Sequence, residues 1–240
     1  MFKKIFIFII ISCSFGLHAQ FRVQNHFDGG ITQMTAGGFM SNSTFLDYTI
    51  QKTTFKIGTR LDIVNPIEDH HLISGFHFEI MQKLPVEKVE ISFSLLFFSH
   101  FFSSWIHEHN TALSGALKTK HIELKTGIHF RMLYLPKGAG DLSESYDHRT
   151  IFELWNIMYH FKYFIKPIDS KWNVAVGISN MDYFVINQTS NPMGLLFGSF
   201  ELNPQLRFFG EYRLFNAGVM NISANYFGSL FRTGVIWNID

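Results

Sequence analysis

Apolar and polar side chains alternate with a period of two along residues 121–135, HIELKTGIHFRMLYL. One set of alternate positions includes Ile122 and Ile128, and the other set includes Glu123 and Lys125. Successive side chains of a β-strand point to opposite faces of the sheet. The alternation therefore predicts a strand with one apolar face and one polar face.

The same alternation recurs along most of the chain, and turn signals such as Asn65-Pro66 and Asn203-Pro204 separate the alternating stretches. The predicted strands are 28–40, 45–64, 71–84, 88–102, 111–118, 121–135, 150–166, 172–187, 193–203, 205–215 and 229–239. No segment after the N-terminus has a convincing helical period, so the sequence predicts a single all-β domain.

The first residues, MFKKIFIFIIISCSFGLHAQ, have the layout of a secretory signal peptide. Two lysines precede a short apolar stretch, and Ala19 supplies a small residue before the expected cleavage. We therefore expect a signal peptide over 1–19 and a mature domain over 20–240. The alternative is a lipoprotein signal with lipidation at Cys13, for which the preceding apolar stretch is short.

Composition indicates which environment the apolar faces meet. Only 16% of the residues are charged, against roughly 25% in average soluble proteins, and 28 residues are Phe. Such a chain is expected to be poorly soluble unless its apolar surface meets lipid. Yet after the signal there is no run of the roughly 18 apolar residues that a spanning helix needs. The formal net charge of +1 gives no broad basic surface for nucleic acid.

A closed β-barrel is then the remaining way to pair every backbone amide in hydrocarbon. We predict a transmembrane antiparallel up-and-down β-barrel with its apolar face in lipid and its polar face in the lumen. Tyr134, Trp172 and Trp237 lie near strand ends and are interpreted as an aromatic girdle. Such barrels normally have even strand numbers, so we expect about ten strands, with 28–40 or 111–118 not a strand, and twelve as the alternative.

The expected topology also assigns the connections to the two sides of the membrane. Counting back from the last strand places 136–149, 187–192 and 216–228 outside the cell, and the short turns 167–170 and 203–205 in the periplasm. This agrees with the longer extracellular loops and short periplasmic turns of outer-membrane barrels.

The signal ending in HAQ, the aromatic alternating strands and the closing stretch LFRTGVIWNID resemble the outer-membrane β-barrel proteins of Gram-negative bacteria, particularly the Bacteroidetes type. The resemblance covers the whole mature chain and rests on pattern. It implies an outer-membrane location, with membrane lipid and the barrel-assembly machinery as partners. One departure is the final Asp240, where many such barrels end in an aromatic residue.

No motif with strong catalytic or metal-binding character is found. No His is followed by Ser at the second position, and no G-x-S-x-G occurs. His107 and His109 would lie on one side of a strand, but two histidines without a third ligand favour a solvated loop. The sequence therefore predicts no catalytic, cofactor-binding or metal-binding residue, and it favours a protein that is not an enzyme.

Charged side chains on the polar faces are the predicted lumen residues. They are Glu79, Lys83, Glu123, Lys125, His129, Arg131, Arg207, Glu211, Arg213 and Arg232. They fit either a network that fills a narrow barrel or the lining of an anion-preferring pore.

Three functions compete on this pattern. The first is a structural or binding barrel that presents an extracellular ligand site at 136–149 and 216–228. The second is a small passive channel, and the third is a lipid-modifying outer-membrane enzyme.

Overall fold

The computed structural model describes residues 19–32, 37–65, 71–84, 86, 89–101, 107–135, 149–184, 186, 192–215 and 227–239. The strands are β1 (Ala19–Thr32), β2 (Gly38–Ile50), β3 (Thr53–Val64), β4 (Ile73–Leu84), β5 (Glu90–Phe101), β6 (His107–Lys118), β7 (Ile122–Leu135), β8 (Arg149–Phe164), β9 (Trp172–Ser179), β10 (Met193–Asn203), β11 (Leu206–Phe215) and β12 (Phe227–Ile239). Of the expected signal peptide, residues 1–18 lie outside the described part of the chain, as does Cys13, and β1 begins at Ala19.

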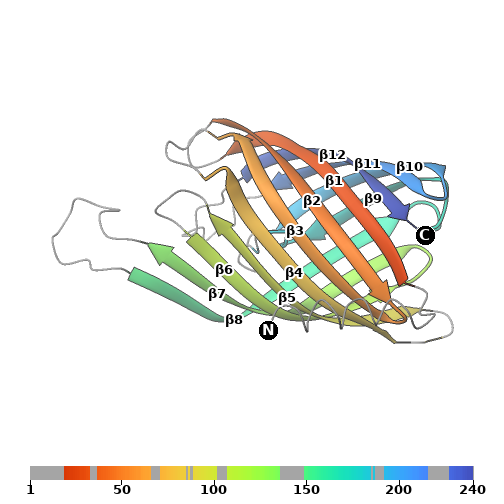
Figure 1. Cartoon of the computed structure of the whole chain (residues 1–240), viewed down its shortest axis with the longest axis horizontal. Coiled ribbons are helices and arrows are strands. Elements are labelled where there is room, and N and C mark those ends of the chain that lie inside the picture. The colour runs from red at the N-terminus through yellow and green to blue at the C-terminus, as the bar shows by residue number, and fades with distance from the viewer. Residues whose placement is uncertain are drawn as a thin grey trace, which may run out of the picture.

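The strands form one closed antiparallel barrel in which each strand pairs with its neighbours in sequence (Figure 1). The barrel closes where β1 pairs with β12, with Phe21 opposite Ile239 and Thr32 opposite Phe227. A closed barrel leaves no unpaired sheet edge, which is the requirement for crossing a membrane with strands. The predicted all-β antiparallel barrel is therefore confirmed.

The preferred number of ten strands is wrong, because the barrel has the twelve strands of the alternative. The predicted strand 28–40 spans the end of β1 and the start of β2, and the predicted strand 45–64 contains the turn between β2 and β3. That turn is formed by Gln51 and Lys52, and Gln51 adopts a positive φ of 55°. Neither residue is Gly or Pro, so the sequence carries no ordinary turn signal there.

The two faces of the wall differ in the way the alternation predicts. Large apolar side chains point outward and stay exposed, with 56% exposure for Phe93 and 53% for Leu113. Charged side chains such as Arg60, Asp62 and Arg232 point inward and are almost completely buried. A water-soluble barrel has the opposite arrangement, because its apolar face forms the core.

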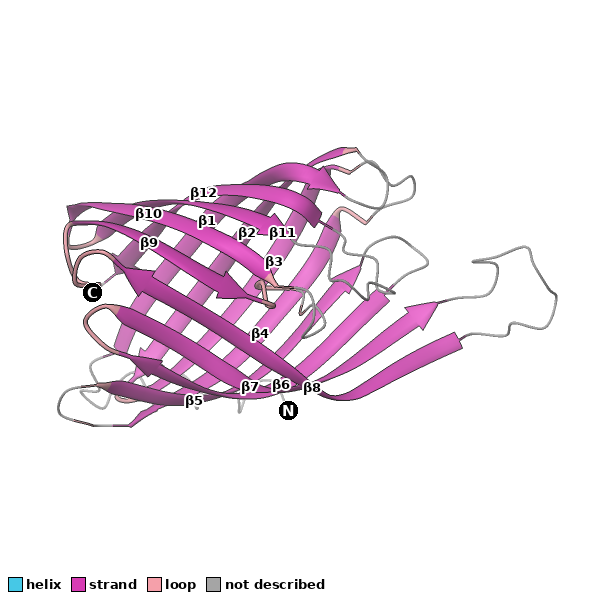
Figure 2. Cartoon of the chain, turned by 180° about the vertical axis from the view of Figure 1, so that it is seen from behind, coloured by secondary structure: helices cyan, strands magenta, loops and turns pink. Residues whose placement is uncertain are grey.

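The two ends of the barrel also differ. Short turns join β2 to β3, β6 to β7 and β10 to β11 at the end where β1 begins and β12 ends. At the opposite end β7 and β8 extend well beyond their neighbours (Figure 2). The connections predicted to be extracellular all leave from this second end.

No helix in the described residues has the length and apolar character needed to cross a membrane.

Candidate functional site

The described residues that follow β9 turn into the barrel. The predicted strand 172–187 is wrong beyond Ser179, where β9 ends. The Asn180 side chain ends the ladder by bonding to the backbone of β8, since its Oδ1 accepts from the Tyr159 N–H at 2.7 Å and its Nδ2 donates to the Ile157 carbonyl at 2.8 Å. We call residues 180–184 and 186 the inward segment. A β-bridge between Met181 and Ile186 folds this segment into a tight loop.

Asp182 anchors the inward segment to two arginines of the wall. Arg232 on β12 donates to both carboxylate oxygens, from Nη1 to Oδ1 at 2.9 Å and from Nη2 to Oδ2 at 3.0 Å. Arg213 on β11 forms an ion pair with the same carboxylate, with 3.0 Å between Nη1 and Oδ1. All three side chains are buried. Charged side chains are stable in such a place only when they are paired and hydrogen-bonded. We call Arg213 and Arg232 the arginine pair.

The arginine pair keeps Asp182 ionised. Burial on its own raises the pKa of the Asp182 carboxyl, but the charges of Arg213 and Arg232 and the hydrogen bonds from Arg232 and the Tyr183 backbone lower that pKa well below its ordinary value. The contact is therefore present above the ordinary pKa of an aspartate and is lost only as the pH falls through the lowered value.

The arginine pair belongs to a larger ionic cluster in the wall. Asp28 on β1 accepts from Arg232 Nε at 2.7 Å and from Nη2 at 2.9 Å. Glu211 accepts from Arg213 Nε at 2.6 Å and from the Lys162 ammonium at 2.9 Å. The wall partners thus fix the orientation of both guanidinium groups through N–H groups other than Nη1, which faces Asp182 in each arginine.

Tyr183 holds the centre of the inward segment. Its hydroxyl accepts from Gln24 Nε2 at 3.1 Å, and its carbonyl oxygen lies 2.7 Å from His77 Nδ1. Its ring lies 4.7 Å from the ring of Phe45, measured between centroids. A Cβ atom at Gly58 would lie 2.2 Å from the Phe45 ring, so only glycine there leaves room for Phe45 beside Tyr183.

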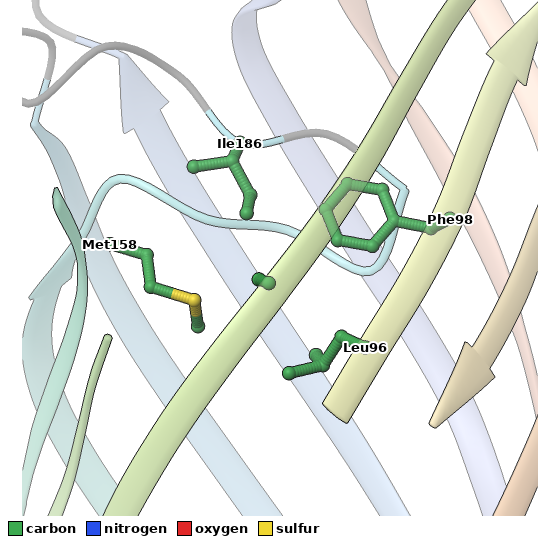
Figure 3. Packing of buried hydrophobic residues seen from close by; sticks show 5 residues of the cluster. Leu96, Phe98, Met158 and Ile186 are labelled. Atoms are coloured by element: carbon green, nitrogen blue, oxygen red, sulfur yellow. The ribbon is translucent and has the colours of Figure 1, made fainter. Parts of the chain in front are cut away.

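Ile186 anchors the other end of the segment to an apolar patch of the wall. It packs with Leu96 and Phe98 of β5, Ala112 of β6 and Met158 of β8. Figure 3 shows the labelled side chains of β5, β8 and the inward segment pointing toward one another. The segment therefore reaches from the ionic cluster at β11 and β12 to the apolar patch at β5, β6 and β8.

The structure places the predicted lumen residues at several levels of the interior. Glu211, Arg213 and Arg232 join the ionic cluster. Lys125 binds Glu79 at 2.8 Å, and Arg131 binds the buried Glu108 at 2.8 Å.

The remaining predicted lumen residues form no ion pair with Asp182, Arg213 or Arg232 among the described residues. His129 is buried. Glu123 lies 3.9 Å from His160, and Arg207 binds Glu201 at 2.6 Å. Lys83 pairs with Glu90 at 3.3 Å, and both side chains are partly exposed.

Sequence reasoning missed the acidic partners that complete the ionic cluster. Asp28 lies inside β1, whereas the predicted strand 28–40 begins at this residue. Asp182 lies in a stretch interpreted as strand. One available signal was the end of alternation after Ser179, where Asn180, Met181 and Asp182 follow in sequence. That signal shows where the strand ends, although it does not show that the chain enters the lumen.

The outer face carries one pair with the composition of a nucleophile and its base. His109 Nδ1 lies 2.7 Å from Ser99 Oγ on the neighbouring strand. Within the described residues no acidic partner of His109 is found, and no group of three or more metal-binding side chains occurs. The rings of His107 and Phe101 are 5.1 Å apart, so this region contains aromatic packing at a strand end. The loops predicted to bind a ligand, 136–149 and 216–228, lie almost entirely outside the described residues.

No protein-family model and no curated protein matches the sequence. Solved structures match at low identity. The KdgM porin is 8% identical with a TM-score of 0.52, over 91% of this chain and 99% of that chain. The NanC porin is 14% identical with a TM-score of 0.50, over 90% and 98%. An outer-membrane channel from Pseudomonas putida F1 is 6% identical with a TM-score of 0.52, over 94% and 97%. The Bacteroidetes-type resemblance stays a prediction, and these likenesses show that the chain has the closed β-barrel fold of outer-membrane proteins.

Proposed function

We propose that this protein is a solute channel of the Gram-negative outer membrane and that the inward segment closes its lumen. The exposed apolar belt of the wall supports a location in lipid, since contiguous apolar surface of this extent is rare on soluble proteins. In this proposal membrane lipid surrounds the belt, and the barrel-assembly machinery inserts the chain.

The observation that carries the proposal is the way the interior is occupied. A purely structural barrel of this kind can be filled by side chains of its own strands. Here a connecting segment reaches from an ionic contact at β11 and β12 to an apolar contact at β5, β6 and β8. The described residues of the segment contact the wall through ion pairs, hydrogen bonds and apolar packing, and the chain continues from the segment into β9 and β10. A closing element of this kind can leave the lumen while the wall stays intact.

A disulfide that locks the segment tests the proposal. A Cβ atom at Gly75 would lie 2.7 Å from Cδ1 of Phe184. Replacing both residues, Gly75→Cys with Phe184→Cys, removes the ring and brings two thiols to this contact. The only native cysteine is Cys13 in the expected signal peptide, so the mature chain offers no competing thiol. We expect the oxidised variant in planar bilayers to conduct at least about tenfold less often than the reduced one, as a shift of roughly 1.4 kcal/mol would produce.

The oxidised and reduced forms of one preparation are each other's control, since both have the same sequence. The Phe184→Cys single variant controls for loss of the ring and should not respond to reductant. Heat-modifiable migration on a gel verifies that each sample is a folded barrel. Equal conductance before and after reduction, with the disulfide verified by mass spectrometry, would contradict closure by the inward segment.

A further inference from the structure

The arginine pair has the geometry of a carboxylate-binding site. Both oxygens of Asp182 are engaged by Arg232, and Oδ1 also lies 3.0 Å from Arg213 Nη1. Guanidinium groups bind carboxylates in this two-pronged way because their N–H groups match the spacing of the two oxygens. Asp182 is thus the present occupant of a site whose side-chain donors, Arg213 and Arg232, belong to the wall.

The site would keep its shape without Asp182. Asp28 holds Arg232 through Nε and Nη2, and Glu211 holds Arg213 through Nε. These partners lie on β1 and β11, which are fixed in the barrel by their strand pairing. Departure of the inward segment therefore uncovers the three N–H groups that now face Asp182, already aimed at one point.

The charge of the wall also favours an anion there. Within the ionic cluster the wall supplies the cations Arg213, Arg232 and Lys162, and the anions Asp28 and Glu211. Asp182 adds the counter-charge that Arg213 and Arg232 share. When it leaves, two buried guanidinium groups lose this shared counter-charge, which is costly unless another anion replaces it.

Aromatic rings of the wall lie beside Lys162 of the same ionic cluster. The ring of Phe209 lies 6.1 Å from that of His26 and 6.3 Å from that of Phe197, measured between centroids. The Lys162 ammonium lies 4.6 Å from the centre of the Phe197 ring. Flat apolar side chains in the same part of the lumen suit a solute with a ring beside its carboxylate.

We propose that Arg213 and Arg232 form a binding site for small organic carboxylate anions in the lumen, and that such anions compete with Asp182 for it. The inference that this competition opens the lumen rests on the proposed channel function. The binding itself does not need conductance, so the two ideas fail separately.

The test measures binding of benzoate to the purified full-length barrel in detergent by titration calorimetry. Asp182→Asn empties the site of its carboxylate. Glu123→Gln removes the same charge from a side chain that is 40% exposed and whose ion pair is with His160, not with either arginine. We expect benzoate to bind Asp182→Asn at least about tenfold more tightly than it binds the wild type or Glu123→Gln. Benzamide, which has the same shape without the charge, should not show this gain.

A second substitution keeps the proposal testable if removal of Asp182 alters the fold. Arg213→Gln in the Asp182→Asn background removes one guanidinium and should return benzoate binding to about the wild-type level, in samples whose heat-modifiable migration shows a folded barrel. Equal benzoate binding by Asp182→Asn and Glu123→Gln, or an equal gain for benzamide, overturns the site. If the disulfide test finds no closure but benzoate follows the expected order, the site stands and the channel function fails.

Discussion

Two of the contacts that hold the inward segment, on either side of Tyr183, differ in chemistry. At β11 and β12 it is held by one carboxylate between two buried guanidinium groups. At β5, β6 and β8 it is held by Ile186 packing on Leu96, Phe98 and Met158. We call these the ionic anchor and the apolar anchor. Both lie in the same lumen and restrain the same short loop.

The difference in chemistry between the two anchors indicates which contact a solute can replace. An ionic contact is directional, and another anion can offer the same two oxygens. The apolar contact is non-directional and depends on the area removed from water. A dissolved anion therefore competes with the ionic anchor, whereas only a change in the side chains weakens the apolar anchor.

The largest effect is expected at the ionic anchor. Asp182→Asn leaves two buried guanidinium groups without their shared counter-charge, and breaking a buried pair in this way costs about 3–5 kcal/mol. We expect a rise of more than about tenfold in the open probability of single channels in planar bilayers. Glu123→Gln, with the same change in net charge, is the control. An open probability equal to that of the control would show that the ionic anchor does not hold the segment.

A smaller effect is expected at the apolar anchor. Ile186→Ala removes atoms from the patch formed with Leu96 and Phe98, and we expect a cost of about 2 kcal/mol, the low end for such truncations. The same recordings should show a higher open probability than in the wild type, but a lower one than in Asp182→Asn. The matched control is Ile157→Ala on the outer face, where the side chain is 52% exposed. If the open probability of Ile186→Ala exceeds that of Asp182→Asn, the apolar anchor holds the segment more strongly than the ionic anchor does.

The smallest effect is the response to salt. Raising the ionic strength shortens the screening length from about 10 Å to about 3 Å, but buried pairs are screened weakly. We expect a modest increase in the open probability of the wild type and of Ile186→Ala between about 0.1 M and 1 M KCl. Asp182→Asn should show no such increase, because it lacks the carboxylate that the salt competes with. A salt response of equal size in Asp182→Asn would show that the ionic anchor does not cause the response.

The alternation in the sequence predicted the wall better than it predicted the contents of the lumen. The faces of β7 and β11 follow directly from their period of two, because neighbouring strands force each side chain to one side of the wall. The turn at Gln51 was missed because its residues carry no turn signal. Asp182 was missed for another reason, since no local pattern tells whether a connecting segment turns inward. Its position depends on Arg213 and Arg232, which lie 31 and 50 residues further along the chain.

The ionic cluster also joins the two ends of the chain. Arg232 on the last strand binds Asp28 on the first strand, 204 residues away in sequence, across the line where the barrel closes. Asp182 and Tyr183 contact Arg232 and Gln24 on either side of that same line. Contacts of such sequence separation form late, since their loop-closure entropy must be overcome first. The surface that binds the inward segment is therefore complete only after the first and last strands have met.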